Sequence, residues 1–299
     1  MDVGGERAVL GAFLLGSVLA GGNSVGIRFS NRELDPLWGA GLRFSLAAAV
    51  LVGLMAVLRL EVPRGRALAG AVAFGLLNFG AAFALAYHAF VELHAGFGQI
   101  LLAVVPLATL LLAVAWRQER VRLAAVTGTL LALAGIAVMS RAPLEEAASV
   151  TSILAALGSA LCFAQAAVLV RRFPAVHPVT LNALGMAAGA ALLLLAAAVA
   201  GEAFALPEDD ETWTAVAYLV TAGSVGVFLL YLFVLGRWSA SRAAYTFVLI
   251  PFVTVLLSAW LDDEPLGLGL VLGGLLVLAG VYFGALRPSE PLRDIRSPG

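Results

Sequence analysis

Long apolar stretches separated by short polar breaks occupy almost the whole chain. A helix needs about 20 apolar residues to cross ~30 Å of hydrocarbon, and ten runs of roughly that length can be counted. Their approximate limits are Ala8–Ile27, Leu37–Leu58, Ala67–Tyr87, Ala95–Trp116, Leu123–Met139, Val150–Val170, Val179–Ala200, Trp213–Leu235, Ala243–Leu261 and Leu266–Leu286. The pattern predicts an all-α integral membrane protein with ten transmembrane helices.

The composition agrees with this prediction. Hydrophobic residues make up 62% of the chain, charged residues only 12%, and the mean hydropathy is +0.99, which excludes a water-soluble fold with a polar surface. The net charge of -1 gives no reason to expect a nucleic-acid partner. Cys162 is the only cysteine, so the chain can form no intrachain disulfide.

The arginines indicate the orientation in the membrane. Every basic residue is an arginine, and with the N-terminus inside, the inner breaks hold fourteen of them and the outer breaks three, Arg28, Arg32 and Arg141. Basic residues resist translocation, so we expect both termini in the cytoplasm, with the chain in the inner or plasma membrane of the cell. Residues 287–299 are then a short cytoplasmic tail.

The chain contains an internal repeat. A shift of 145 positions aligns the fourth and fifth runs with the ninth and tenth without gaps. The matched pairs include Pro106 with Pro251, Glu119 with Glu264, Gly128 with Gly273 and Gly135 with Gly280. Each half has five runs, an odd number, so the second half enters the membrane from the opposite side. Inverted repeats can open a central site to each side in turn, which favours a transporter, although a duplication can also build no more than a stable bundle.

Short motifs follow one another in both halves. They are Gly22-Asn23-Ser24, Leu42-Arg43-Phe44, Val105-Pro106-Leu107, Gln118-Glu119-Arg120 and Leu133-Ala134-Gly135, then Tyr245–Pro251, Asp263-Glu264-Pro265 and Leu278-Ala279-Gly280. With these motifs each half resembles an EamA-type domain of the drug/metabolite transporter superfamily, the first over residues 8–140 and the second over 150–286. The resemblance implies a ten-helix carrier of amino acids, other metabolites or drugs, often outward. Glu92, His94 and Gln99 depart from the residues usual in that family.

Arg43 is the only charged residue well inside an apolar run, six residues after Leu37 and hence ~9 Å from the outer surface. Such a guanidinium can bind a substrate carboxylate in bidentate fashion. Alternatively, it extends to the interface or binds carbonyls of a neighbouring helix. Because the Leu-Arg-Phe motif resembles a family element that does not depend on substrate, the structural role is favoured.

Two amides occupy equivalent places in the two halves. Pro36 aligns with Pro178 at a shift of 142, which pairs Asn23 with Gln165. Amides offer donors and acceptors without a buried charge, so we expect both to line a central cavity, although they can also bridge helices. Weaker candidates for substrate contact are Asn78, Gln99, Tyr231 and Tyr245.

Pro106 and Pro251 are expected in the middle of their spans, where proline removes a backbone hydrogen bond. They are candidates for a pair of hinges. The alternative is a static kink whose free carbonyl is satisfied by neighbouring groups.

No motif for metal, nucleotide or covalent chemistry stands out. His88, Glu92 and His94 are loosely spaced and lack a fourth metal ligand, and no phosphate-binding loop occurs. We therefore expect no cofactor, no ATP-driven pumping and no enzymatic activity. Carboxylates fall at the ends of runs, which argues against tight proton coupling and strongly cationic substrates.

The sequence thus predicts a secondary transporter of small metabolites that exports its substrate by alternating access, with amino acids or related carboxylates as first candidates. The expected partners are a small-molecule substrate and the lipid bilayer, without nucleic acid, in a monomer or homodimer. The alternative is a non-transporting membrane protein on the same scaffold, such as a sensor or an assembly factor.

Overall fold

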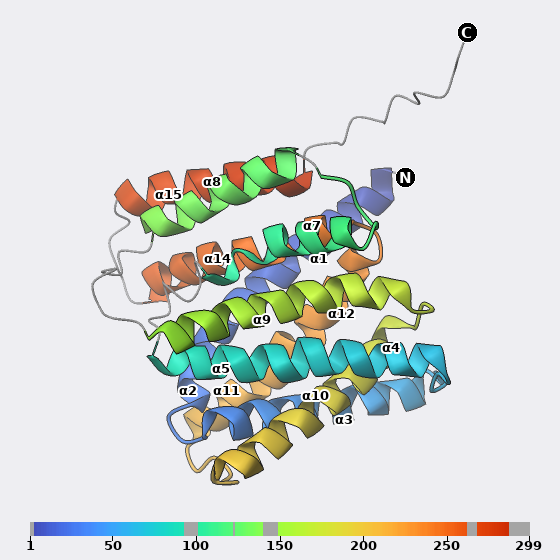
Figure 1. Cartoon of the computed structure of the whole chain (residues 1–299). Helices are drawn as coiled ribbons and strands as arrows, with labels where there is room; N and C mark the ends of the chain where they lie inside the picture. Colours follow the sequence, from blue (N-terminus) through green and yellow to red (C-terminus); the bar gives the residue numbers. More distant parts are fainter. Residues whose placement is uncertain (1–2, 93–100, 122, 140–148, 262–267, 287–299) are drawn as a thin grey trace.

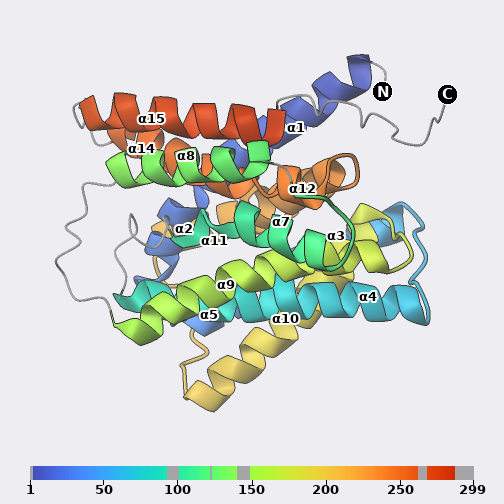
Figure 2. The same cartoon turned by 45° about the horizontal axis from the view of Figure 1, so that its top comes forward.

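The computed structural model describes residues 3–92, 101–121, 123–139, 149–261 and 268–286, and every element in these ranges is helical. The longer helices run side by side in a bundle (Figures 1 and 2). The segment up to residue 139 is called the first half below, and the segment from residue 149 the second half.

The elements of the first half are α1 (Val3–Gly21), α2 (Asn23–Ser30), α3 (Pro36–Val57), α4 (Arg66–Gly75), η1 (Leu76–Ala81), α5 (Ala82–Glu92), α7 (Val105–Ala115) and α8 (Leu123–Met139). Those of the second half are α9 (Val150–Leu169), η2 (Val170–Arg172), α10 (Pro178–Ala200), α11 (Asp210–Val220), η3 (Thr221–Gly226), α12 (Val227–Leu235), α13 (Ala240–Ala243), α14 (Thr246–Leu261), α15 (Leu268–Val281) and η4 (Tyr282–Leu286). Each predicted apolar run overlaps at least one of these elements.

Within the described ranges, five helices are long and apolar enough to cross a membrane. They are Pro36–Val57, Arg66–Ala89, Val150–Arg172, Pro178–Ala200 and Asp210–Leu235. The apolar helices Val105–Ala115, Leu123–Val138, Ala240–Val253 and Leu272–Leu286 are shorter. The chain is therefore a multi-pass membrane protein, and the count of ten spans stays a prediction.

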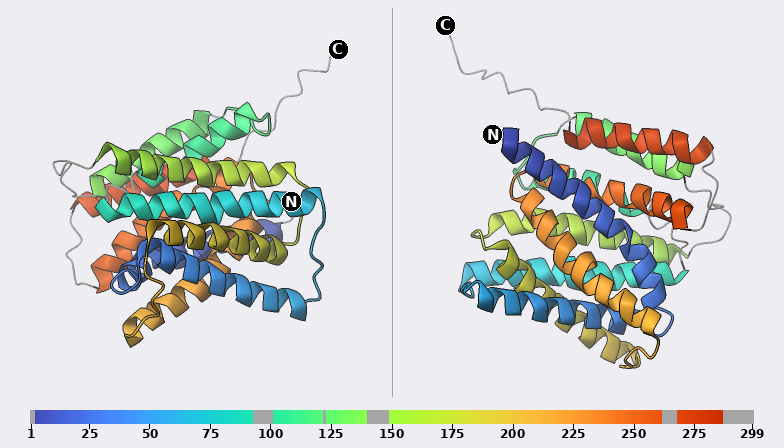
Figure 3. Two further views of the ribbon diagram at one scale, coloured as in Figure 1. Left: turned by 60° about the horizontal axis from the view of Figure 1, so that its bottom comes forward. Right: turned by 180° about the vertical axis from the view of Figure 1, so that it is seen from behind.

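Helices in equivalent places of the two halves pack against one another. The pair α3 and α10 forms one edge of the bundle, and the pair α8 and α15 the opposite edge (Figure 1). Other contacts also occur in matched pairs, because α1 contacts α12 (Figure 3) as α9 contacts α5, and α1 contacts α14 as α9 contacts α7. Exchanging the two halves leaves these contacts unchanged.

Four glycines determine how α8 and α15 cross. A Cβ on Gly128 would lie 2.7 Å from the carbonyl oxygen of Gly280, and a Cβ on Gly135 would lie 2.6 Å from that of Gly273. The repeat alignment pairs the same four residues as Gly128 with Gly273 and Gly135 with Gly280. Gly128 therefore contacts the repeat equivalent of Gly135, and Gly135 contacts the repeat equivalent of Gly128. The two helices are antiparallel, and any larger side chain at these positions would separate their backbones.

Candidate functional site

Two helices are interrupted by a six-residue π-helical turn at equivalent places. The turn η1 joins α4 to α5, and the turn η3 joins α11 to α12. Leu76–Ala81 and Thr221–Gly226 differ by 145 positions, the shift that also aligns the repeats. A π-helical turn breaks the regular ladder of helical hydrogen bonds and often marks a functional site.

The side chains of Arg43 and Asn23 meet at η3. Arg43 of α3 is 1% exposed, and it donates from Nε to Ser224 Oγ at 2.7 Å and from Nη2 to the carbonyl of Gly223 at 2.9 Å. Asn23, the first residue of α2, donates from Nδ2 to the same carbonyl at 3.2 Å. Two predicted site residues of the first half are thus held by one turn of the second half.

The guanidinium of Arg43 lies among aromatic rings. Its Cζ is 5.1 Å from the ring centroid of Phe44 and 5.5 Å from that of Phe83, and Tyr87 lies close enough to interact with its charge. Nη1 of Arg43 and Oδ1 of Asn23 are buried, and neither has a hydrogen-bond partner among the described residues. Two donors of Arg43 therefore hold the neighbouring helix, as its structural role requires. Nη1 meets no described acceptor at hydrogen-bond geometry, but the Tyr87 hydroxyl interacts with the guanidinium and would compete with a ligand for it.

The aromatic surroundings continue across the contact between the halves. The rings are those of Phe44, Phe79, Phe83, Phe163, Phe228 and Phe247. The ring centroids of Phe79 and Phe228 are 4.7 Å apart, and those of Phe83 and Phe163 are 5.6 Å apart. Arg43 is thus a cation in an apolar environment, where an unpaired charge is costly.

The other predicted site residues that the structure describes make no hydrogen bond to Gly223 or Ser224. Asn78 lies on η1, is 2% exposed, and its Nδ2 has no partner in the described part of the chain. Gln165 is partly buried in α9 and does not join the hydrogen bonds at Gly223. Tyr231 is buried in α12 with its ring 6.3 Å from that of Phe247, and Gln99 lies outside the described residues.

Tyr245 and the two prolines occupy other contacts. Tyr245 is buried, and its hydroxyl donates to the carbonyl of Ala125 at 2.8 Å and lies 3.0 Å from Thr129 Oγ1, both on α8. Pro251 lies inside α14, as expected, whereas Pro106 lies in the first turn of α7 rather than in mid-helix. A proline fits there because the first turn needs no internal N–H donor.

Sequence reasoning missed three residues. Gly223 has no side chain and takes part through its carbonyl, which accepts two side-chain bonds in the π-helical turn η3. Its alignment with Asn78 is the one sequence signal. Ser224 is a small polar residue in an apolar run and was passed over. Asn182 of α10 is fully buried, and neither atom of its amide has a partner among the described residues.

At the acidic end of the bundle, a carboxylate of each half accepts hydrogen bonds from backbone N–H groups at or just before the start of a helix in the other half. Glu202, which follows α10, accepts from the N–H of Trp38 near the start of α3 at 2.7 Å. Glu33 of the first half accepts from the N–H of Glu208 at 3.0 Å and of Asp209 at 3.2 Å, just before α11. These reciprocal bonds hold the two halves together at this end.

The same bonds shift the pKa values of two carboxyl groups. Desolvation opposes the charge of Glu33, but the N–H donors of Glu208 and Asp209 outweigh it, so the pKa of Glu33 lies below its usual value. The pKa of Asp209 is raised, because its side chain shares a hydrogen bond with Glu33 and is repelled by that charge. Neutralising Asp209 should therefore strengthen the contact, and neutralising Glu33 should weaken it.

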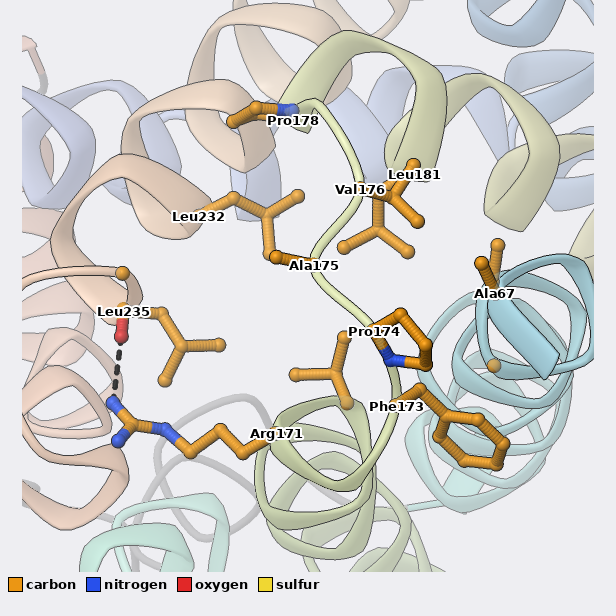
Figure 4. A pocket seen from close by; sticks show the side chains of 14 residues that line it. Ala67, Arg171, Phe173, Pro174, Ala175, Val176, Pro178, Leu181, Leu232 and Leu235 are labelled. Carbon is orange, nitrogen blue, oxygen red and sulfur yellow. Dashed lines mark hydrogen bonds between the residues drawn. The ribbon is translucent and has the colours of Figure 1, made fainter. Parts of the chain in front are cut away.

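The opposite, arginine-rich end has a pocket between the halves. It encloses about 420 Å³ and is lined by α4 of the first half and by η2, α10, α12 and the loop at 173–176 of the second half (Figure 4). Of the described residues that line it, Arg171 alone is ionisable. Figure 4 shows its guanidinium directed at the end of α12, where Nη2 donates to the carbonyls of Leu235, at 2.6 Å, and of Trp238.

The repeated helices, the matched contacts and the buried polar group between the halves are the features of a multi-pass membrane transporter built from a repeat. The EamA-like transporter family matches the chain over residues 7–141 and again over 150–285. The chain belongs to this family, and it is a membrane transporter.

Similar proteins agree with this assignment. An uncharacterized transporter, YvbV, of Bacillus subtilis is 31% identical over 174 residues, which are 56% of this chain and only about half, 55%, of the Bacillus protein. An uncharacterized transporter of Archaeoglobus fulgidus is 25% identical over 86% of this chain and 91% of its own length. A crystal structure described only as that of a protein has the same fold, with a TM-score of 0.80 and 21% identity over 94% of this chain and 97% of the other.

Proposed function

We propose that the protein is a secondary transporter that exports small carboxylate-bearing metabolites, amino acids or their relatives, by alternating access between two inverted five-helix repeats. Ten spans, with both termini in the cytoplasm, belong to this proposal. The observation that carries it is the buried guanidinium of Arg43, held between the halves with Nη1 unpartnered.

The chemistry of the site favours an anionic group. Within the described residues no Asp or Glu forms an ion pair with Arg43, and the hydroxyl and the carbonyl that hold it are neutral. A buried cation of this kind is stabilised by an anion, and a carboxylate forms short charge-assisted bonds with a guanidinium. Asn23 Oδ1 offers an acceptor for a donor group on the same substrate.

The arrangement of the halves supports alternating access. Arg43 and Asn23 belong to the first half, but their partners belong to η3 of the second half, so relative motion of the halves changes the site. The π-helical turns at equivalent positions are places where such helices can bend. The halves are joined by carboxylate bonds at both ends, through Glu33 and Glu202 at the acidic end and through Glu119 at the arginine-rich end, and the pocket lies at the arginine-rich end. By the arginine rule, the pocket then faces the cytoplasm, as the loading state of an exporter requires.

Counterflow into proteoliposomes tests the proposal. Wild-type protein should exchange labelled amino acids or related carboxylates, and Arg43→Gln should abolish the exchange while the protein still inserts and folds. Arg32→Gln is the matched control, because Arg32 forms an exposed ion pair with Glu211 at 3.1 Å. If Arg43→Gln lowers thermal stability but leaves transport per folded molecule intact, Arg43 is structural and the proposed substrate class is wrong.

A further inference from the structure

The pocket at the arginine-rich end has the composition of a binding site for an amphipathic anion. Apart from Arg171, its walls are made of Ala, Gly, Val, Leu, Pro and Phe side chains. Its volume of about 420 Å³ falls in the range that holds a small organic molecule. Among the described residues, the walls offer no carboxylate to bind a cationic group and no second cation to bind a dianion.

Arg171 is held in place but retains free donors. Both of its hydrogen bonds leave from Nη2, so Nε and Nη1 donate to no described residue. Glu119 is close enough to act on the charge of Arg171, but its carboxylate accepts from the N–H of Ser241 at 3.2 Å and from its hydroxyl at 2.5 Å. A fixed guanidinium with an unused edge is suited to a carboxylate.

One helix connects this pocket to Arg43. Leu235 and Leu232 of α12 line the pocket, and Phe228 follows one turn closer to η3. The ring of Phe228 lies 6.5 Å from that of Phe44, over which the guanidinium of Arg43 is placed. Eleven residues separate Leu235 from Ser224, which corresponds to ~16 Å along a helix.

We propose that this pocket is the entry site for the transported molecule, and that it selects monocarboxylates with an apolar, ring-sized body over zwitterions and amines. Arg171 binds the carboxylate first, the apolar walls hold the body, and the molecule then moves along α12 to Arg43. This inference rests on the proposed function and narrows its substrate class to carboxylates without a charged amino group, which excludes the free amino acids.

Cysteine protection measures occupancy of the pocket without relying on transport. Ala175 lines the pocket and is exposed, so Ala175→Cys in a Cys162→Ala background provides a single site for maleimide in phosphatidylcholine nanodiscs. Phenylacetate should slow the labelling at least about fivefold, whereas phenethylamine and L-phenylalanine should slow it little. Equal protection by either of these two compounds would overturn the proposed selectivity.

Matched variants assign the effect to the pocket. Arg171→Gln should raise the phenylacetate concentration that gives half-maximal protection roughly tenfold or more. Arg172→Gln should leave it unchanged, because Arg172 donates to the carbonyl of Trp116 at 2.8 Å and does not line the pocket. Should Arg171→Gln fail to fold, Ala67→Trp fills the pocket and should abolish protection, while Ala69→Trp on the exposed side of α4 should not.

Two further measurements, one with an anionic lipid and one of counterflow, distinguish the entry site from a lipid-headgroup site and from a failure of the proposed function. If nanodiscs containing phosphatidylglycerol protect the cysteine without any ligand and phenylacetate adds nothing, the pocket holds a lipid headgroup and the inference is wrong. Phenylacetate protection that requires Arg171, in a protein that shows no counterflow, supports the site and contradicts the proposed function. Counterflow that requires Arg43 but is insensitive to both Arg171→Gln and Ala67→Trp contradicts the entry site alone.

Discussion

A methyl group added to Gly223 should break the contact that holds Asn23. A Cβ at this position would lie 3.1 Å from Asn23 Cγ and closer still to its Oδ1. The amide must then leave its position, which costs the hydrogen bond to the Gly223 carbonyl, about 0.5–1.5 kcal/mol, and about 0.5–1.5 kcal/mol of side-chain strain. Gly223→Ala should therefore lose about 1–3 kcal/mol locally, before the helix-propensity gain of alanine over glycine.

Gly226 supplies the matched control within the same turn. A Cβ there would meet only Leu19 Cδ1 at 3.5 Å and the Thr221 carbonyl at 3.6 Å, which are ordinary contacts. Gly226→Ala brings the same gain in helix propensity, about 1 kcal/mol, without the clash. The difference between the two variants thus isolates the local loss of about 1–3 kcal/mol, measured as the free energy of reversible unfolding in mixed detergent micelles.

A double-mutant cycle completes the test. If the clash is with Asn23, Gly223→Ala should cost little in an Asn23→Ala background, and the two changes should be strongly non-additive. Equal destabilisation by Gly223→Ala in both backgrounds would refute the arrangement at η3. So would Gly226→Ala if it destabilised the protein as much as Gly223→Ala does.

Three other outcomes are expected. In a cysteine-free background, single cysteines in the loop at 117–122 should label only from the cytoplasm and those at 208–211 only from outside; the reverse would contradict the orientation. Because the pKa of Glu33 is lowered, its contribution to stability is present above its unfolded value, near 4.5, and is lost as the pH falls through the folded value. Glu33→Gln should therefore lower the thermal unfolding midpoint near pH 7 but not at about pH 3, and Asp209→Asn should raise that midpoint near pH 7. If neither variant changed the midpoint, the contact of Glu33 with residues 208 and 209 would be contradicted. Gly135→Ala should destabilise the protein by about 1–3 kcal/mol in the same unfolding assay, because the added methyl meets the backbone of α15, and a neutral result would contradict that crossing.

The sequence was sufficient to locate the helices but not their interruptions. The run Leu123–Met139 has the same limits as α8, because hydrophobic length decides where a membrane helix begins and ends. The break at Gly22 and the π-helical turns η1 and η3 lie inside the predicted apolar runs, and hydropathy does not respond to a change in backbone hydrogen bonding. For the same reason hydropathy does not show that α7 begins at Val105, one residue before Pro106.

The candidate site could be predicted only in part. Arg43 stands out in any reading, because it is a charge inside an apolar run, but its partners lie about 180 residues away along the chain. The pairing of Asn23 with Gln165 follows from the repeat, and in the structure the two residues belong to helices that contact different π-helical turns. Asn23 binds η3, while α9, which carries Gln165, packs against η1, the equivalent turn of the other half.

The two halves share one arrangement of helices, but they differ in the residues at equivalent buried positions. The shift of 142 that pairs Pro36 with Pro178 also pairs Arg43 with Gly185, which packs against the backbone of Gly75 so closely that a Cβ on Gly185 would lie 3.3 Å from the Gly75 Cα. The guanidinium of one half is thus replaced in the other by a residue that brings two helices together. A symmetric pair of buried arginines would repel each other and would need two anions, whereas one arginine facing a glycine carbonyl at the opposite π-helical turn needs only one. In the proposed mechanism the symmetry lets the halves exchange conformations, and its local failure at Arg43 leaves one proposed anion site between them rather than two.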